Sequence, residues 1–145
     1  MTLKWISLVA VTLLVAAIVT LLFRHALFAS RPAMIAVQAV AVGLLLWARL
    51  TFGVRSFHGG ANPTAGGLVT TGPYRWLRHP IYAAFLLFVG ASMISYPGAV
   101  NLMLGGVVAA MTAVRIVAEE RLVVERYPEY AAYKARTKRI IPFVF

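Results

Sequence analysis

Two short stretches of the chain hold the side chains that could do chemistry. "RWLRHPIY" begins at Arg75, and "RIVAEERLVVERYPEY" begins at Arg115 and contains all four acidic residues of the protein. The chain has no cysteine, and its three scattered histidines are a poor set of metal ligands, so no metal site is expected. No nucleophile stands beside a base with an orienting acid. Paired carboxylates, an imidazole and tyrosines instead suit a ligand that carries an amine and a carboxylate.

The first stretch ends where a helix should begin. His79 precedes Pro80 and is therefore disfavoured in helical geometry, whereas Pro80 suits the first turn of a helix. Tyr82 follows within the same turn. A helix start offers free N–H groups and partial positive charge, so a polar or anionic ligand there would meet Arg78 and His79 together. An aromatic and basic membrane anchor is the simpler explanation for the neighbouring Arg75.

The second stretch is predicted to be a helix that carries two adjacent carboxylates. Glu119 lies one turn after Arg115, where an ion pair on an exposed helix contributes only ~0.2–0.5 kcal/mol. Glu120 interrupts an apolar stripe that includes Ile116 and Val123, and a buried carboxylate needs a cationic partner or a ligand. The helical face favours Glu120 as the inward carboxylate, whereas the spacing from Arg115 favours Glu119. Both remain candidates.

Apolar segments must position these stretches. The 145-residue chain is 61% hydrophobic with a mean hydropathy of +0.84, which exceeds a typical soluble domain. Four runs, over about 5–23, 33–52, 80–95 and 99–118, approach the ~20 residues that span a bilayer, although the third is short. The first run is longer than a signal peptide requires, so we expect it to be retained. We predict a single all-α membrane domain over residues 1–145, with four transmembrane helices.

The basic residues predict an orientation. Most of the Lys and Arg residues fall in the N-terminus, the 53–79 loop and the 119–145 tail, so we expect a multi-pass protein of the cytoplasmic (inner) membrane with these segments and the active site facing the cytoplasm. The tail is expected to be amphipathic, with Tyr130 and Tyr133 on a short helix after Pro128. It would fold over the cytoplasmic mouth of the bundle and bring the two polar stretches together. No nucleic-acid reader motif accompanies the net charge of +10, so a nucleic acid partner is not expected.

The two stretches resemble the signatures of a known superfamily. "LVTTGPYRWLRHPIY" is similar to Leu-Val-x-x-Gly-x-Tyr-x-x-x-Arg-His-Pro-x-Tyr, and "RIVAEERLVVERYPEYAAYKARTKRIIP" resembles Arg-x-x-x-Glu-Glu followed by paired tyrosines and a basic stretch ending in Pro. Both belong to the isoprenylcysteine carboxyl methyltransferase and phospholipid methyltransferase superfamily. The resemblance implies an integral membrane methyltransferase that depends on S-adenosylmethionine.

The resemblance also implies roles for particular residues. Arg115 would face the methyl acceptor as substrate-binding residue and, with Glu119, position the reactants as a catalytic residue. The residues expected to bind the cofactor are Leu68, Val69, Tyr74, His79, Pro80, Ile81, Tyr82, Glu119 and Glu120.

The methyl acceptor is expected to be a small lipophilic molecule or a membrane lipid. Four spans are fewer than in the prenylcysteine enzymes, so its identity stays open, as does the oligomeric state. The first two spans, with Gln38 and Arg49 as their main polar groups, are expected to shape its pocket. Two alternatives remain: an NADPH-dependent membrane reductase of similar architecture, and a membrane module without catalytic activity.

Overall fold

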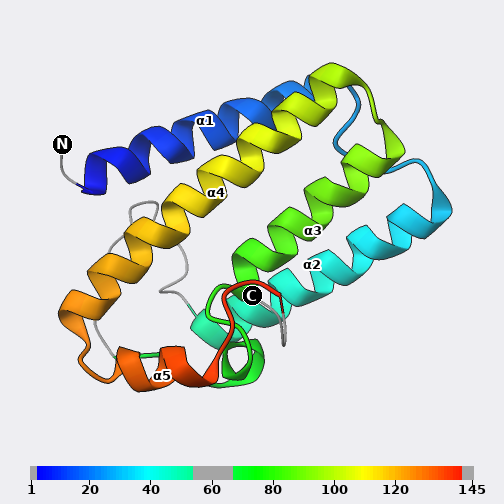
Figure 1. Cartoon of the computed structure of the whole chain (residues 1–145). Coiled ribbons are helices and arrows are strands. Elements are labelled where there is room, and N and C mark those ends of the chain that lie inside the picture. The colour runs from blue at the N-terminus through cyan, green and yellow to red at the C-terminus, as the bar shows by residue number, and fades with distance from the viewer. Residues whose placement is uncertain (1–2, 54–66, 142–145) are drawn as a thin grey trace.

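The computed structural model describes residues 3–53 and 67–141, and its main elements are helices (Figure 1). In chain order they are α1 (Leu3–Phe23), α2 (Pro32–Phe52), the short 3-10 helix η2 (Gly72–Arg75), α3 (Pro80–Ser95), α4 (Ala99–Arg126) and α5 (Tyr130–Arg136). Three of them, α1, α2 and α4, are long and apolar enough to cross a membrane, and α3 is a shorter apolar helix. The all-helical membrane fold is therefore confirmed. Residues 54–66 of the predicted cofactor loop and 142–145 of the tail lie outside the described residues.

The long helices pack as two antiparallel pairs, α1 along α4 and α2 along α3 (Figure 1). A turn at residues 96–98 joins α3 and α4 as a hairpin, but α3 packs mainly against α2, and α4 packs mainly against α1. The connections 24–31 and 96–98 lie at one end of the bundle, and α5 lies at the other. α4 continues eight residues beyond the predicted span end at 118, which carries its acidic residues out to the α5 end.

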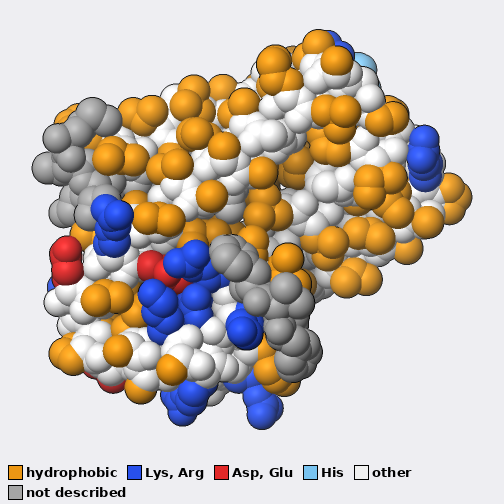
Figure 2. Space-filling view, in the orientation of Figure 1, with side chains coloured by type: hydrophobic (Ala, Val, Ile, Leu, Met, Phe, Trp, Pro, Cys, Tyr) orange, Lys and Arg blue, Asp and Glu red, His pale blue; other side chains and the backbone are white. Residues whose placement is uncertain are grey.

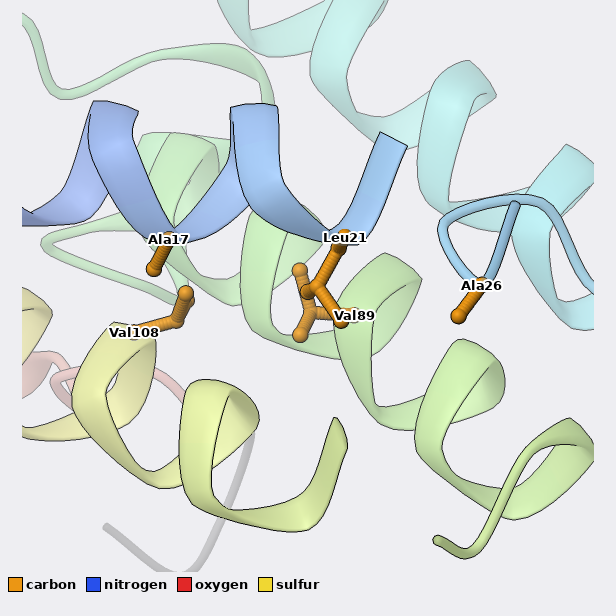
Figure 3. Close-up of a cluster of buried hydrophobic side chains, with 5 residues drawn as sticks. All are labelled: Ala17, Leu21, Ala26, Val89 and Val108. Carbon is orange, nitrogen blue, oxygen red and sulfur yellow. The ribbon is translucent and has the colours of Figure 1, made fainter. Parts of the chain in front are cut away.

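A small apolar core joins the two pairs. Ala17 and Leu21 from α1, Ala26 from the connection, Val89 from α3 and Val108 from α4 are all buried together (Figure 3). Small and branched side chains at this position allow helices to approach closely, which is the main source of helix packing energy in a membrane.

Gln38 links α2 to the 24–31 connection and to α3 at the end of the bundle opposite α5. Its Oε1 accepts a hydrogen bond from the N–H of Ala29 (2.9 Å), and its Nε2 donates to the carbonyl of Leu27 (3.0 Å) and to Ser92 Oγ (3.0 Å). Because α5 and the acidic residues lie at the opposite end, Gln38 does not line a pocket beside them. It instead satisfies the backbone of the 24–31 connection, which a membrane interior would otherwise leave without partners.

Candidate functional site

The two polar stretches meet at the α5 end of the bundle. Figure 2 shows acidic side chains there bordered by Lys and Arg side chains, whereas hydrophobic side chains cover most of the remaining visible face. The last turns of α4 supply Arg115, Glu119 and Glu120, and the start of α3 supplies His79 and Tyr82. The sequence-based expectation that these stretches come together is therefore what the structure shows.

Tyr82, Arg115 and Glu119 form a closed triangle of hydrogen bonds between α3 and α4. The Tyr82 hydroxyl donates to Glu119 Oε1 (2.5 Å), Arg115 Nη2 donates to the same oxygen (2.9 Å), and Arg115 Nε donates to the Tyr82 oxygen (2.8 Å). The predicted ion pair one turn apart on α4 is therefore present, and a residue from α3 completes it. Arg115 is buried, whereas 23% of the Glu119 side chain remains exposed.

Glu120 is the centre of a second cluster. Its Oε1 accepts a hydrogen bond from Arg78 Nε (2.9 Å) and lies 3.3 Å from His79 Nε2, and its Oε2 accepts one from Arg139 Nη2 (3.2 Å). Only 6% of the Glu120 side chain is exposed, against 23% for Glu119, so Glu120 is the more inward of the two candidates, as its helical face indicates. Arg78, in the segment that leads into α3, and Arg139, in the tail, supply the positive charge that the Glu120 carboxylate requires.

Arg78 and Arg139 are site residues that the sequence reasoning did not assign to Glu120. The position of Arg78 directly before His79 was the available signal, because both residues reach the same carboxylate. Arg139 lies 19 residues after Glu120, and no local spacing rule connects the two.

The tail binds along the segment that leads into α3. The N–H of Lys138 donates to the carbonyl of Trp76 (2.9 Å), and in return the N–H of Arg78 donates to the carbonyl of Lys138 (2.7 Å). The N–H of His79 donates to the carbonyl of Arg139 (3.0 Å). This short parallel pairing satisfies backbone groups of both segments and folds the tail back over the α5 end of the bundle.

Tyr133 on α5 fixes the tail from its other side. Its buried hydroxyl donates to the carbonyl of Tyr74 (2.7 Å), whose ring lies against Phe52 at the end of α2. Burial raises the pKa of Tyr133 to about 12, so its phenol keeps the proton that it donates. Gly72 allows η2 to lie close to the end of α2. It has a φ of +55°, and a Cβ there would lie 2.5 Å from Thr51 Oγ1.

Tyr133→Phe is expected to lower the free energy of unfolding by about 1–2 kcal/mol at neutral pH, because the carbonyl of Tyr74 loses a buried donor. The folded pKa lies above the usual value near 10, so the unfolded chain loses this proton first as the pH rises. The advantage of the unmodified protein over the variant should therefore shrink above about pH 10. Paired unfolding curves in detergent at pH 7 and above pH 10 measure both effects, and a constant difference would contradict them.

The remaining predicted residues take no part in the polar contacts of these clusters. Pro80 is buried and begins α3, and Ile81 is half-buried in the same turn. Leu68 and Val69 are half-buried in the segment before η2, and none of the polar contacts described above involves either residue. Among residues 3–53 and 67–141, no group of three or more His, Asp or Glu side chains is placed to hold a metal ion.

The fold and the site together define a polytopic membrane protein with buried ion pairs at one end of its helix bundle. Residues 32–130 match the phospholipid methyltransferase family, and the chain belongs to that family. The resemblance seen in the two sequence signatures is thereby confirmed, and the family is one of membrane methyltransferases.

One curated relative is also similar to the chain. The cobalt-zinc-cadmium resistance protein CzcN of Cupriavidus metallidurans is 37% identical over 76 residues, which cover 52% of this chain and 35% of that protein. The chain thus matches about a third of the length of this relative. No solved structure matches the chain.

Proposed function

We propose that the protein is an integral membrane methyltransferase that transfers a methyl group from S-adenosylmethionine to a small lipophilic or lipid-like acceptor. The observation that carries the proposal is the triangle of Tyr82, Arg115 and Glu119, because it builds a polar, partly exposed site between two apolar helices. Family membership supplies the type of reaction, and the triangle supplies a place for it.

The donor and acceptor groups at the α5 end suit the cofactor. A partly exposed carboxylate at Glu119 can pair with an ammonium group, and the imidazole of His79 beside the start of α3 can meet a carboxylate. S-adenosylmethionine, when bound, supplies an electrophilic methyl group on a sulfonium. The chain itself then has to hold two reactants in line and exclude water, and neither task needs a nucleophilic side chain.

Arg115 is the residue best placed to orient the acceptor. Its guanidinium stays charged at all relevant pH values, and contacts with Tyr82 and Glu119 hold it in one orientation. A fixed positive group beside the attacking atom steers an electron-rich acceptor and stabilises charge that shifts during transfer. The location between apolar helices gives a lipophilic acceptor a route from the bilayer.

The charge distribution supports a cytoplasmic location of the site in the cytoplasmic membrane. Described basic residues gather at the α5 end, whereas the opposite end carries Arg24 and Arg31. The positive-inside rule places the richer end, and with it both termini, in the cytoplasm. The described basic residues at the α5 end include Arg49, Arg75, Arg78, Arg121, Arg126, Lys134, Arg136, Lys138 and Arg139.

Binding of S-adenosylhomocysteine to the detergent-solubilised protein tests the proposal by calorimetry. Glu119→Gln is expected to weaken binding about tenfold, because a charge-assisted contact to the ligand amine is lost. Glu125→Gln is the matched control, since Glu125 is exposed on the same helix. Equal affinities in the two variants would reject Glu119 as a ligand contact. NADPH in place of S-adenosylhomocysteine tests the reductase alternative, and binding of NADPH alone would overturn the proposed reaction.

The acceptor can be found by incubating the protein with a labelled methyl donor and a lipid extract of the host. A labelled product in the lipid fraction, absent with heat-inactivated protein, is the expected result. Label appearing only in water-soluble molecules would contradict a lipophilic acceptor.

A further inference from the structure

The adjacent carboxylates Glu119 and Glu120 both lie near His79, but their other partners differ. Glu119 pairs with Tyr82 and Arg115, and Glu120 pairs with Arg78 and Arg139. This difference assigns them different tasks. We propose that Glu120 is a positioning residue that clamps the C-terminal tail onto residues 76–79, the segment that leads into α3. We propose further that Glu119 is the carboxylate of the pair that binds the ligand. The statement about the ligand rests on the proposed function, whereas the clamp does not.

Both carboxylate oxygens of Glu120 are already engaged. Oε1 faces Arg78 and His79, and Oε2 faces Arg139. If a ligand amine displaced these groups, the guanidinium of Arg78, whose side chain is only 7% exposed, would lose its buried counter-charge. Removing one partner of a buried ion pair is strongly unfavourable, so Glu120 is poorly suited to exchange partners during a catalytic cycle. Glu119 is more exposed than Glu120 and can accept a new partner at lower cost.

Arg78 makes the clamp a junction of three segments. Its Nε binds Glu120 on α4, and its Nη1 donates to the carbonyls of Lys134 (3.1 Å) and Thr137 at the end of α5. Arg139 adds a second link between the tail and α4.

The clamp also reaches the proposed ligand site through His79. The His79 N–H donates to the carbonyl of Arg139, and the His79 ring lies against Glu120. Release of Arg139 would therefore loosen the backbone that holds His79 at the start of α3. Glu120 thus acts on the site through the tail and not by touching the ligand.

The absence of cysteine from the chain allows a direct test of the clamp. Thr137 is buried on the tail, so Thr137→Cys introduces a single thiol that a charged maleimide reaches only when the tail opens. In the full-length protein in detergent, we expect Glu120→Gln and Arg139→Gln each to raise the rate of thiol labelling about tenfold. Glu119→Gln is the matched neighbour and should leave the rate within about twofold of the parent. Arg139→Gln changes a side chain that is partly exposed, so it keeps the test valid if Glu120→Gln does not fold.

Calorimetry with S-adenosylhomocysteine on the same variants completes the test. Glu119→Gln should bind S-adenosylhomocysteine more weakly, while the thiol introduced by Thr137→Cys stays protected from labelling. Glu120→Gln and Arg139→Gln should lose affinity together with protection, and their double variant should resemble Glu120→Gln alone, because the link between Glu120 and Arg139 is already broken in that variant. Unchanged labelling in Glu120→Gln and Arg139→Gln would overturn the clamp. Equal labelling in Glu119→Gln and Glu120→Gln would overturn the division of tasks. If even the parent protein binds no S-adenosylhomocysteine, the proposed function fails while the labelling contrast still decides the clamp.

Discussion

Arg78→Ala is expected to lower the free energy of unfolding by about 3–5 kcal/mol, the range for a buried ion pair that loses one partner. The substitution leaves the Glu120 carboxylate with less counter-charge in a buried position. It also removes the donor that satisfies two carbonyls at the end of α5, those of Lys134 and Thr137. Unfolding in mixed detergent, followed by circular dichroism, measures the loss.

Arg75→Ala is the control for this prediction, because it removes the same type of side chain three residues earlier. Arg75 is exposed and lies 4.7 Å above the ring of Trp76, a cation–π contact at the surface. Such contacts contribute about 0.5–1 kcal/mol. Equal losses from the two substitutions would show that Arg78 has no special role in binding the tail. A much larger loss at Arg78 would show that charge at this end is used for folding as well as for orientation in the membrane.

Arg115→Gln is expected to reduce methyl transfer about 10²–10³-fold, the range for removal of one fixed charge or donor that acts in the transition state. Glutamine keeps a polar group at this position but carries no charge, and it cannot donate to Tyr82 and Glu119 in the forked arrangement of a guanidinium. Affinity for S-adenosylhomocysteine should change much less, because the acceptor and not the cofactor is the partner proposed for Arg115. Single-turnover transfer of labelled methyl groups into a lipid extract measures the rate.

The matched control is Arg121→Gln, since Arg121 is exposed on the same helix and makes none of the contacts described for the triangle. Its transfer rate should equal that of the unmodified protein. If Arg115→Gln retains full activity, the acceptor is not oriented by this guanidinium. If it loses cofactor affinity as strongly as rate, Arg115 belongs to the cofactor site instead.

Much of the site could be predicted because its residues lie in two short, ordered stretches. Pro80 marks the start of α3, and the alternation of apolar and acidic residues on α4 points Glu120 inward. Both are local signals, set by the geometry of a single helix. The pairing of α1 with α4 and of α2 with α3 could not be predicted in this way, because lipid-facing and helix-facing apolar residues look alike in a membrane protein.

The sequence by itself determined that the chain is a bundle of apolar helices with its charges gathered in two stretches, because bilayer thickness and side-chain hydration act on each segment separately. Only the tertiary structure decided which polar and charged groups pair with one another. Arg139 reaches Glu120, and Tyr82 reaches Glu119, across long intervals of sequence. Gln38, expected from the sequence to shape the acceptor pocket, instead binds the 24–31 connection at the end of the bundle opposite α5. These partners are chosen by how the helices and the tail pack in three dimensions, and no spacing along the chain encodes that choice.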